Sequence, residues 1–418
     1  MVELGYKDAG YEYVNLDDCW QAPNRTATGH LEANHERFPN GIAALADYVH
    51  GKGLKLGLYT AMGMETCASH RFTAGQLGLQ CDFTTIPNCT VAKRDIDDFV
   101  SWNIDSLKVD GCGNFDRVDQ NNSYAIVGGY LADAVAARGT GPVVYHPSNL
   151  AFRFPRQFRE LQAIANQWRF FHDVDSTWAS VSSIIDNIGA GQPACIPGPL
   201  PANCTYYDGG RDQNTFCASY CVERGPFLDV PGKGGWHDPD MLIVGNTPCS
   251  PADLKNGMHC GTLTPDEERT QMAIWSMASA PLLMSNDLAA VPASSRAILQ
   301  NREVLAIDQD PLGRMCFRYL DDGAGTGAQA WRKELAGGDV AIAIVNMGDT
   351  APIAAGFGVD LAADAGYAPD TRVRVRDVFA QADVGGWHAG TFKTVAPIPP
   401  HGVLLLRLSF VGRYAGEL

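Results

Sequence analysis

The chain has 418 residues, of which 45% are hydrophobic, and this composition excludes an intrinsically disordered protein. Its length suits one large α/β domain followed by a smaller domain. The formal net charge of −15 argues against nucleic acid and anionic membranes as partners, and it fits a neutral or cationic small substrate. No apolar run is long enough to predict a membrane span.

Cysteines and glycosylation sequons indicate the compartment. The chain has 12 cysteines, and N-x-S/T sequons begin at Asn24, Asn88, Asn121 and Asn203. Both features are typical of an oxidising secretory compartment, so we expect a secreted, lysosomal or vacuolar protein. Because no signal peptide is present, we also expect that the natural N-terminus is missing from this chain.

Strand-like and helix-like segments alternate over the first three quarters of the chain. Apolar runs between turns predict strands, and apolar residues at helical spacing predict helices. In chain order we expect strand 11–18, helix 41–52, strand 54–60, helix 92–102, strand 104–110, helix 121–138, strand 142–146, helix 155–163, strand 165–171, helix 176–188, strand 235–242, helix 265–279, strand 281–287 and helix 293–300. This alternation, with polar groups at the strand ends, predicts a (β/α)8 TIM barrel whose first strand would precede residue 1.

The character of the sequence changes near residue 313. Short alternating runs follow, separated by Gly and Pro turns, at 328–333, 340–345, 372–377 and 403–408. These runs predict a C-terminal antiparallel β-sandwich. We therefore expect a catalytic barrel at 1–312 and a sandwich at 313–418. Two cysteine-rich insertions, near 72–90 and 193–231, are expected within the barrel.

The segment 104–112 predicts a short buried strand with a charged end. Because strand side chains alternate, Leu107 and Val109 point to one side, and Lys108 and Asp110 point to the other. Charges are seldom placed in a buried strand unless they are paired or used. The carboxyl end of a barrel strand is also where catalytic groups lie. These residues alone leave two interpretations open, a structural ion pair and a catalytic site.

Other predicted strands end in the same way, with acidic, basic or aromatic side chains. The residues at these ends are Asp17, Asp18, Tyr59, Lys108, Asp110, Arg169, Asp173, Asp238 and Asp240. Carboxylates with aromatic rings are typical of sugar sites, because carboxylates accept hydrogen bonds from hydroxyl groups and rings cover the apolar sugar face.

Metal, nucleotide and serine-hydrolase chemistry compete with the sugar interpretation. Asp clusters bind divalent ions, but Lys108 and Arg169 would repel a cation from the same pocket. The sequence contains no H-x-H pair, no H-E-x-x-H, no P-loop, no dinucleotide fingerprint and no G-x-S-x-G. We therefore expect neither a metal nor a cofactor.

Seven strings resemble the α-galactosidase / α-N-acetylgalactosaminidase family of retaining glycoside hydrolases. They are LDDCW (16–20), KGLKLGLYT (52–60), LKVDGCG (107–113), WRFFHDVDSTW (168–178), GGWHDPDML (234–242), APLLMSNDL (280–288) and IDQDPLG (307–313). The resemblance covers about residues 3–315 and continues weakly to PPHGVLLLRL (399–408). It implies a (β/α)8 barrel followed by a β-sandwich, and a carbohydrate substrate with a terminal α-galactosyl or α-N-acetylgalactosaminyl group. The resemblance also leaves open that the protein forms a homodimer.

The resemblance implies that Asp110 is the nucleophile and Asp173 is the general acid/base. Retention of configuration needs these carboxyl groups about 5–5.5 Å apart. Asp110 must stay ionised, which Lys108 favours, whereas Asp173 must hold its proton near the working pH. Water activated by Asp173 would then hydrolyse the glycosyl-enzyme.

The resemblance also implies the sugar contacts and one disulfide. The expected contacts are Asp17 and Asp18 with O6 and O4, Lys108 and Arg169 with O3 and O2, Asp240 near O2 and O3, and Tyr59 and Cys67 along the pocket wall. A Cys67–Cys112 disulfide would lie beside the site. The sequence also allows a small Cys81–Cys89 bridge.

The chain departs from the family pattern at two places that affect function. Ser148 stands where α-galactosidases have a Glu that recognises a free 2-hydroxyl group, and Ala151 stands where the family pattern has a bulky side chain. Ser and Ala there make room for an acetamido group, so N-acetylgalactosamine is the alternative to galactose. The family's first strand is also absent, which leaves Cys19 without its family partner. An inactive galactoside-binding homologue is therefore a third alternative.

Overall fold

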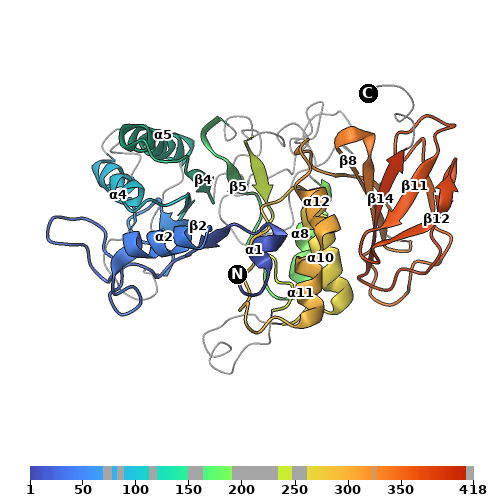
Figure 1. The fold of residues 1–418 in the computed structure, drawn as a ribbon, viewed down its shortest axis with the longest axis horizontal. Helices are drawn as coiled ribbons and strands as arrows, with labels where there is room; N and C mark the ends of the chain where they lie inside the picture. Colours follow the sequence, from blue (N-terminus) through green and yellow to red (C-terminus); the bar gives the residue numbers. More distant parts are fainter. Residues whose placement is uncertain are drawn as a thin grey trace, which may run out of the picture. The chain divides into compact units, whose positions relative to one another are not determined.

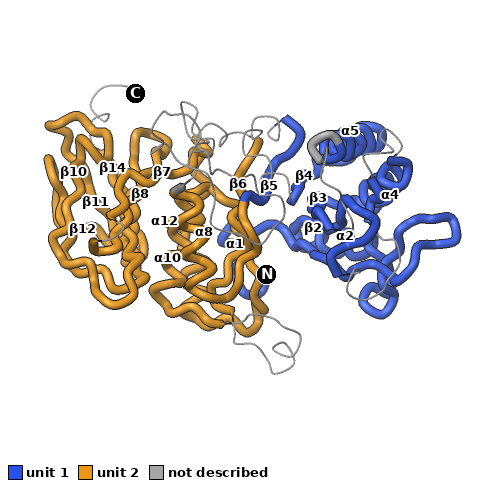
Figure 2. The backbone as a smooth tube through the Cα atoms, turned by 180° about the vertical axis from the view of Figure 1, so that it is seen from behind, with its two compact units in different colours: residues 1–170 blue, residues 171–418 orange. Residues whose placement is uncertain are grey.

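The computed structural model (Figure 1) describes residues 1–68, 78–81, 89–112, 120–148, 163–190, 234–246, 261–322 and 325–410. They form two compact units, Met1–Phe170 and Phe171–Leu418 (Figure 2). Most of the two cysteine-rich insertions and of the expected helix 155–163 lies outside the described residues. None of the helices in the described ranges is long and apolar enough to cross a membrane.

The first unit contains a parallel four-stranded sheet with helices around it (Figure 1). Its strands, which pair in chain order, are β1 (Tyr13–Asn15), β2 (Lys55–Ala61), β3 (Ser106–Asp110) and β4 (Val144–Pro147). Its helices are α1 (Tyr6–Ala9), α2 (Gly41–Gly51), α4 (Thr90–Ser101) and α5 (Gln120–Arg138), and β5 (Gln167–Arg169) follows near the end of the unit. This order is that of consecutive strand–helix repeats in a barrel.

The register of β2 against β3 brings together the polar side chains at the strand ends. Six of the seven residues of β2 are buried, as expected for a parallel strand that is covered on both faces. Tyr59 pairs with Lys108, and Ala61 pairs with Asp110. The phenol ring of Tyr59 and the charges of β3 therefore lie at the same edge of the sheet.

The second unit begins with the helical part of the chain. It contains α8 (Trp178–Ala190), β6 (Trp236–Asp238), α10 (Pro265–Met277), α11 (Ala293–Leu299) and α12 (Arg302–Asp308). Helix α10 begins with a capping box, in which the Thr264 hydroxyl accepts from Glu267 N and the Glu267 carboxylate accepts from Thr264 N. Ten of its 13 residues are buried, which makes it the central helix of this part.

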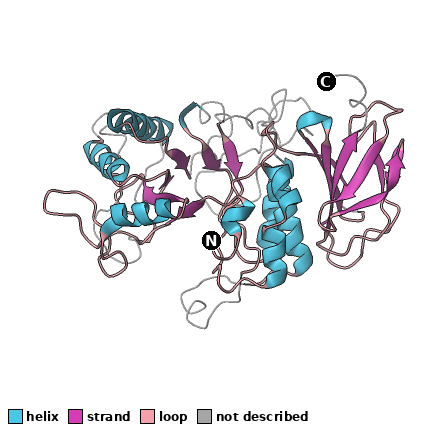
Figure 3. Ribbon diagram, viewed as in Figure 1, coloured by secondary structure: helices cyan, strands magenta, loops and turns pink. Residues whose placement is uncertain are grey.

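A β-sandwich completes the second unit (Figure 3). Six antiparallel strands pair in the order β12-β11-β14-β9-β8-β7, and β10 pairs with β13. Their bounds are β7 (Phe317–Asp321), β8 (Ala328–Glu334), β9 (Val340–Asn346), β10 (Gly358–Asp360), β11 (Val373–Asp377), β12 (Ala382–His388), β13 (Thr391–Lys393) and β14 (Val403–Phe410). Buried residues from both sheets, including Ile342, Val359, Val375 and Phe392, share one core.

The structure corrects one predicted strand and adds several elements. The segment 281–287 is not a strand, because it forms only a single parallel bridge, from Met284 to Leu242. Pro281 has no N–H group to donate, and its carbonyl accepts from Leu283 N in a tight turn. Helix α12 and strands β7, β10, β12 and β13 were not predicted, because they are short or exposed.

Lys333 is buried where β8 meets helices α10 and α12. Its ammonium group donates to the carbonyl oxygens of Ser276 and Ile307, at 2.8 and 2.6 Å, and to Ser279 Oγ at 2.7 Å. Burial lowers its pKa to about 8, although the charge of buried Asp308 opposes this. These three bonds connect the sandwich to the helices of the same unit.

Asp308 makes the stability of the protein depend on pH. Burial raises its pKa from 3.8 to about 7, and the charge of Lys333 only partly opposes this. Between about pH 4 and pH 7 the folded protein therefore holds a proton that the unfolded chain releases, so this group lowers stability as the pH rises. We expect that Asp308→Asn, which cannot titrate, has a melting temperature that falls less over this range than that of the wild type.

Thermal unfolding at several pH values checks this expectation. The matched control is Asp47→Asn, which makes the same chemical change at an exposed position of α2. The control should keep the pH dependence of the wild type. The same dependence in Asp308→Asn would contradict the assignment.

Candidate active site

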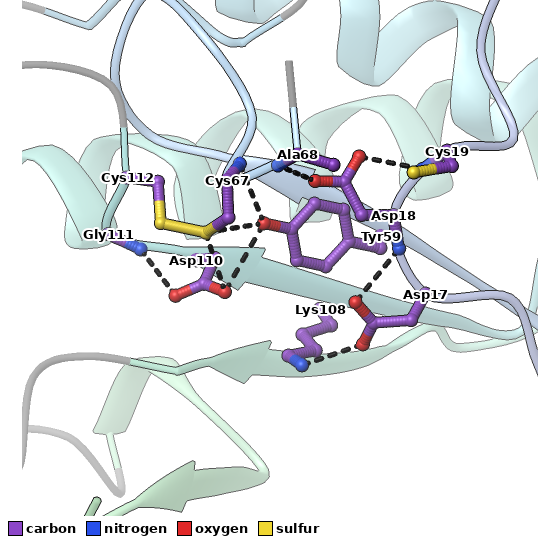
Figure 4. Close-up of a disulfide and its surroundings, with 10 residues drawn as sticks. All are labelled: Asp17, Asp18, Cys19, Tyr59, Cys67, Ala68, Lys108, Asp110, Gly111 and Cys112. Atoms are coloured by element: carbon purple, nitrogen blue, oxygen red, sulfur yellow. Dashed lines mark hydrogen bonds and ion pairs between the residues drawn. A yellow bond between two sulfur atoms is a disulfide. The ribbon is translucent and has the colours of Figure 1, made fainter. Parts of the chain in front are cut away.

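Two carboxylates follow β1, and the ion pair between one of them and Lys108 joins β1 to β3 (Figure 4). Lys108 Nζ donates to Asp17 Oδ2 at 2.7 Å. The pKa of Lys108 is above its usual value: burial lowers it, but the charges of Asp17 and Asp110 together outweigh the burial. Lys108 is therefore a protonated cation whose charge interacts with Asp17 and Asp110.

Asp110 is held on both of its carboxylate oxygens. Oδ1 accepts from Gly111 N at 2.8 Å, and Oδ2 accepts from the Tyr59 hydroxyl group at 3.2 Å. Tyr59 is 1% exposed, and its pKa is raised first by burial and then by the charge of Asp110. Tyr59 therefore stays a neutral phenol that donates a hydrogen bond to Asp110, and this bond helps to fix the orientation of Asp110 at the end of β3.

A disulfide between Cys67 and Cys112 forms one wall of this cluster (Figure 4). Cys67 Sγ lies 3.0 Å from the Tyr59 hydroxyl oxygen and 3.4 Å from Asp110 Oδ2. Cys67, Asp110 and Cys112 are close enough together to suggest metal ligands. Oxidised sulfur is not a thiolate, however, so this group is a poor metal site. A second disulfide joins Cys81 to Cys89.

Among the described residues, backbone N–H groups hold the carboxylate of Asp18. Its Oδ2 accepts from Ala68 N and its Oδ1 accepts from Cys19 N, both at 2.7 Å. Cys19 has a left-handed backbone with φ of 72°, and it forms no disulfide with a described residue. Partial burial and the charge of Asp18 raise the pKa of its thiol. The carboxylate of Asp17 is thus held by an ion pair with Lys108, and that of Asp18 is held by backbone N–H groups.

In the second unit, Asp173 and Asp240 lie on neighbouring segments. Asp173 is exposed, and its carbonyl oxygen accepts from His172 Nδ1 at 3.1 Å. The next residue, Val174, donates its backbone N–H to Asp240 Oδ2 at 2.7 Å. Asp240 is 9% exposed. The carboxylate of Asp240 therefore contacts the segment that carries Asp173.

The predicted site residues are thus distributed over both units. The cluster of Figure 4 contains Asp17, Asp18, Tyr59, Cys67, Lys108 and Asp110. Buried Ser148 and Arg169 come directly after β4 and at the end of β5. Ala151 lies outside the described residues. The backbone donors at Gly111, Ala68 and Val174 were not foreseen, because every residue except proline carries an N–H group and the sequence gives no signal for its use.

Two family models match the chain. The model described as "Alpha galactosidase A" matches residues 1–209 and 214–310. The model described as "Alpha galactosidase C-terminal beta sandwich domain" matches residues 325–408.

Curated proteins and solved structures agree with these matches. Human α-galactosidase A is 35% identical over 350 residues, which cover 83% of this chain and 65% of that protein. The α-N-acetylgalactosaminidase of Gallus gallus is 32% identical over 412 residues, which cover 97% of this chain and 83% of that protein. The crystal structure of α-galactosidase I from Mortierella vinacea matches with a TM-score of 0.71 and 25% identity, over 99% of this chain and 91% of that one.

The fold and these matches place the chain in a class of glycoside hydrolases with a TIM barrel and a C-terminal antiparallel β-sandwich. The chain belongs to the α-galactosidase / α-N-acetylgalactosaminidase family. The family and the fold class predicted from the sequence are therefore confirmed. The residue roles within the site stay predictions.

Proposed function

We propose that the protein is a retaining exo-α-glycosidase that removes terminal α-linked galactose from glycosides, glycolipids or oligosaccharides. The observation that carries this proposal is Asp110, a carboxylate at the end of a buried parallel strand. Tyr59 and Gly111 fix its orientation, and the protonated Lys108 lies two residues before it in β3. Relatives named as α-galactosidases support the choice of sugar.

The proposed reaction has two displacement steps. In the first step, a carboxylate oxygen of Asp110 attacks the anomeric carbon, while protonated Asp173 gives its proton to the leaving oxygen. In the second step, Asp173 takes a proton from water, which attacks the same carbon and releases Asp110. Asp17, Asp18, Lys108 and Arg169 are proposed to bind the sugar hydroxyl groups, with Tyr59 and Cys67 along the wall.

N-acetylgalactosamine is a second candidate substrate because of Ser148. Ser148 is 6% exposed, and its backbone N–H donates to the Val109 carbonyl at 2.8 Å. This bond places Ser148 beside the residue that precedes Asp110. In this proposal its small side chain makes room for an acetamido group on the sugar. The relative from Gallus gallus is named as an α-N-acetylgalactosaminidase.

Hydrolysis of two chromogenic substrates, an α-galactoside and an α-N-acetylgalactosaminide, tests the proposal. We expect turnover of the galactoside. If Ser148 makes room for an acetamido group, Ser148→Glu should lower kcat/KM for the acetamido substrate by at least about tenfold relative to the galactoside. The matched control is Ser294→Glu at an exposed position of α11. Binding of galactose without turnover of either substrate would instead indicate an inactive homologue.

The disulfides and sequons support a location in the secretory pathway. We propose a secreted or a lysosomal or vacuolar enzyme. Enzymatic removal of N-linked glycans from the protein purified from its natural source should lower its apparent mass. An unchanged mass would mean that none of the four sequons carries an N-linked glycan.

A further inference from the structure

Asp240 is anchored at three atoms within the second unit. Its backbone N donates to Asp238 Oδ1 at 2.8 Å, and its carbonyl oxygen accepts from Trp275 Nε1 at 2.7 Å. Its side-chain Oδ2 accepts from Val174 N at 2.7 Å. Its φ is +82°, a left-handed backbone conformation that residues other than glycine seldom adopt. A strained residue with three fixed contacts is typical of a functional position.

Helix α10 holds the segment that contains Asp240. Gln271 accepts from Ile243 N at 3.0 Å and donates to the Met241 carbonyl at 3.1 Å. Glu268 accepts from Gly245 N at 2.8 Å. Glu268, Gln271 and Trp275 are buried, and their spacing of three and four residues places them on one face of the helix. One face of a buried helix therefore bonds the backbone from residue 240 to residue 245.

Val174 is the residue that links this arrangement to Asp173. The bond from Val174 N to Asp240 fixes the peptide unit between residues 173 and 174, and this unit carries the Asp173 carbonyl. The side chain of Asp173 itself is exposed. A displacement of about 1 Å in a reacting group can lower a rate about a hundredfold. The Asp240 carboxylate therefore helps to set the orientation of the Asp173 backbone.

We propose that Asp240 is a positioning residue that fixes the backbone of Asp173, and that Trp275 and α10 hold Asp240 in place. This inference rests on the proposed role of Asp173 as the acid/base. It differs from the prediction that Asp240 mainly binds the sugar near O2 and O3. A sugar ligand would affect substrate affinity, whereas a positioning residue affects the rate of the chemical step.

Three variants test the proposal by separate measurement of kcat and KM. Asp240→Ala removes the acceptor of Val174 N and should lower kcat about a hundredfold, with KM changed by less than about threefold. Asp240→Asn keeps a side-chain oxygen and tolerates the left-handed backbone, so it should recover most of the lost kcat. Trp275→Phe removes only the indole N–H and part of the ring, and should lower kcat about tenfold.

The chain offers a matched control for the tryptophan variant. Trp331, on β8, is also 0% exposed, but its Nε1 has no hydrogen-bond partner among the described residues. Trp331→Phe should lower the melting temperature as Trp275→Phe does and leave kcat unchanged. An equal loss of kcat in both variants would overturn the proposal, because the effect would then be a general loss of packing.

Hydrogen exchange of the Val174 amide gives a readout that does not depend on activity. Exchange should be faster than in the wild type in Asp240→Ala and Trp275→Phe, and close to the wild type in Asp240→Asn. Unchanged exchange, or an increase in KM without a loss of kcat, would overturn the positioning role. If the wild type hydrolyses neither sugar, faster exchange in these variants would still support the contact between Asp240 and Val174. The proposed function would then be rejected instead.

Discussion

Asp110→Asn is expected to lower kcat on the α-galactoside by at least about a thousandfold while the protein stays folded. The loss follows from the chemistry, because a neutral amide is too weak a nucleophile to attack the anomeric carbon. Folding should persist because the amide has nearly the shape of the carboxylate. Its oxygen can still accept the Tyr59 hydroxyl or Gly111 N, which are 3.2 and 2.8 Å from the carboxylate oxygens.

The design separates the loss of the nucleophile from a loss of structure. Initial rates give the activity, and thermal unfolding gives the stability. Asp97→Asn is the matched control, because Asp97 is an exposed carboxylate on α4 that forms a long ion pair with Lys93, at 3.8 Å. The control should keep the activity of the wild type. Near-normal turnover by a folded Asp110→Asn protein would reject Asp110 as the nucleophile.

The polar site residues at the strand ends could be predicted from the sequence because charged side chains are unfavourable in a buried strand. Lys108 and Asp110 alternate with apolar residues in a strand that is otherwise buried, and only a paired or functional role resolves that conflict. The structure contains the Lys108–Asp17 ion pair and also places Asp110 against Tyr59. A structural ion pair at Lys108 and a catalytic role of Asp110 are thus compatible, because the two residues have different partners.

The sequence could not predict contacts that depend on register or on backbone donors. Leu283 and Met284 lie in an apolar run that resembles a strand, but only tertiary pairing decides that one bridge forms there. Nothing in the sequence indicates, either, that polar residues of α10 are buried and bond to the backbone of another segment. A buried Gln271 or Glu268 looks like an exposed helix position until the backbone that it bonds is known. For the same reason, no sequence signal indicates the contact between the Asp240 carboxylate and Val174 N.

Removal of the Cys67–Cys112 disulfide is expected to reduce both stability and activity. The bridge spans a sequence separation of 45 residues, and closing a loop of that length restricts the unfolded chain by about 4 kcal/mol in the chain-entropy description. The bridge also contacts the Tyr59 hydroxyl that orients Asp110. The double variant Cys67→Ser/Cys112→Ser should therefore unfold at lower urea concentration and show a reduced kcat.

The Cys81–Cys89 bridge of the same chain is the matched control. Its separation of eight residues predicts a smaller stabilisation of about 2.5 kcal/mol. Among the described residues, the backbone of Cys81 bonds to Met62 and that of Cys89 bonds to Lys93, rather than to Asp110 or Tyr59. Cys81→Ser/Cys89→Ser should thus lose less stability and keep most of its kcat. Urea unfolding followed by tryptophan fluorescence, together with initial rates, measures both quantities. If the two double variants lost equal activity, the effect of the first bridge would come from general destabilisation, because a specific effect on Asp110 requires the contact that only Cys67 makes.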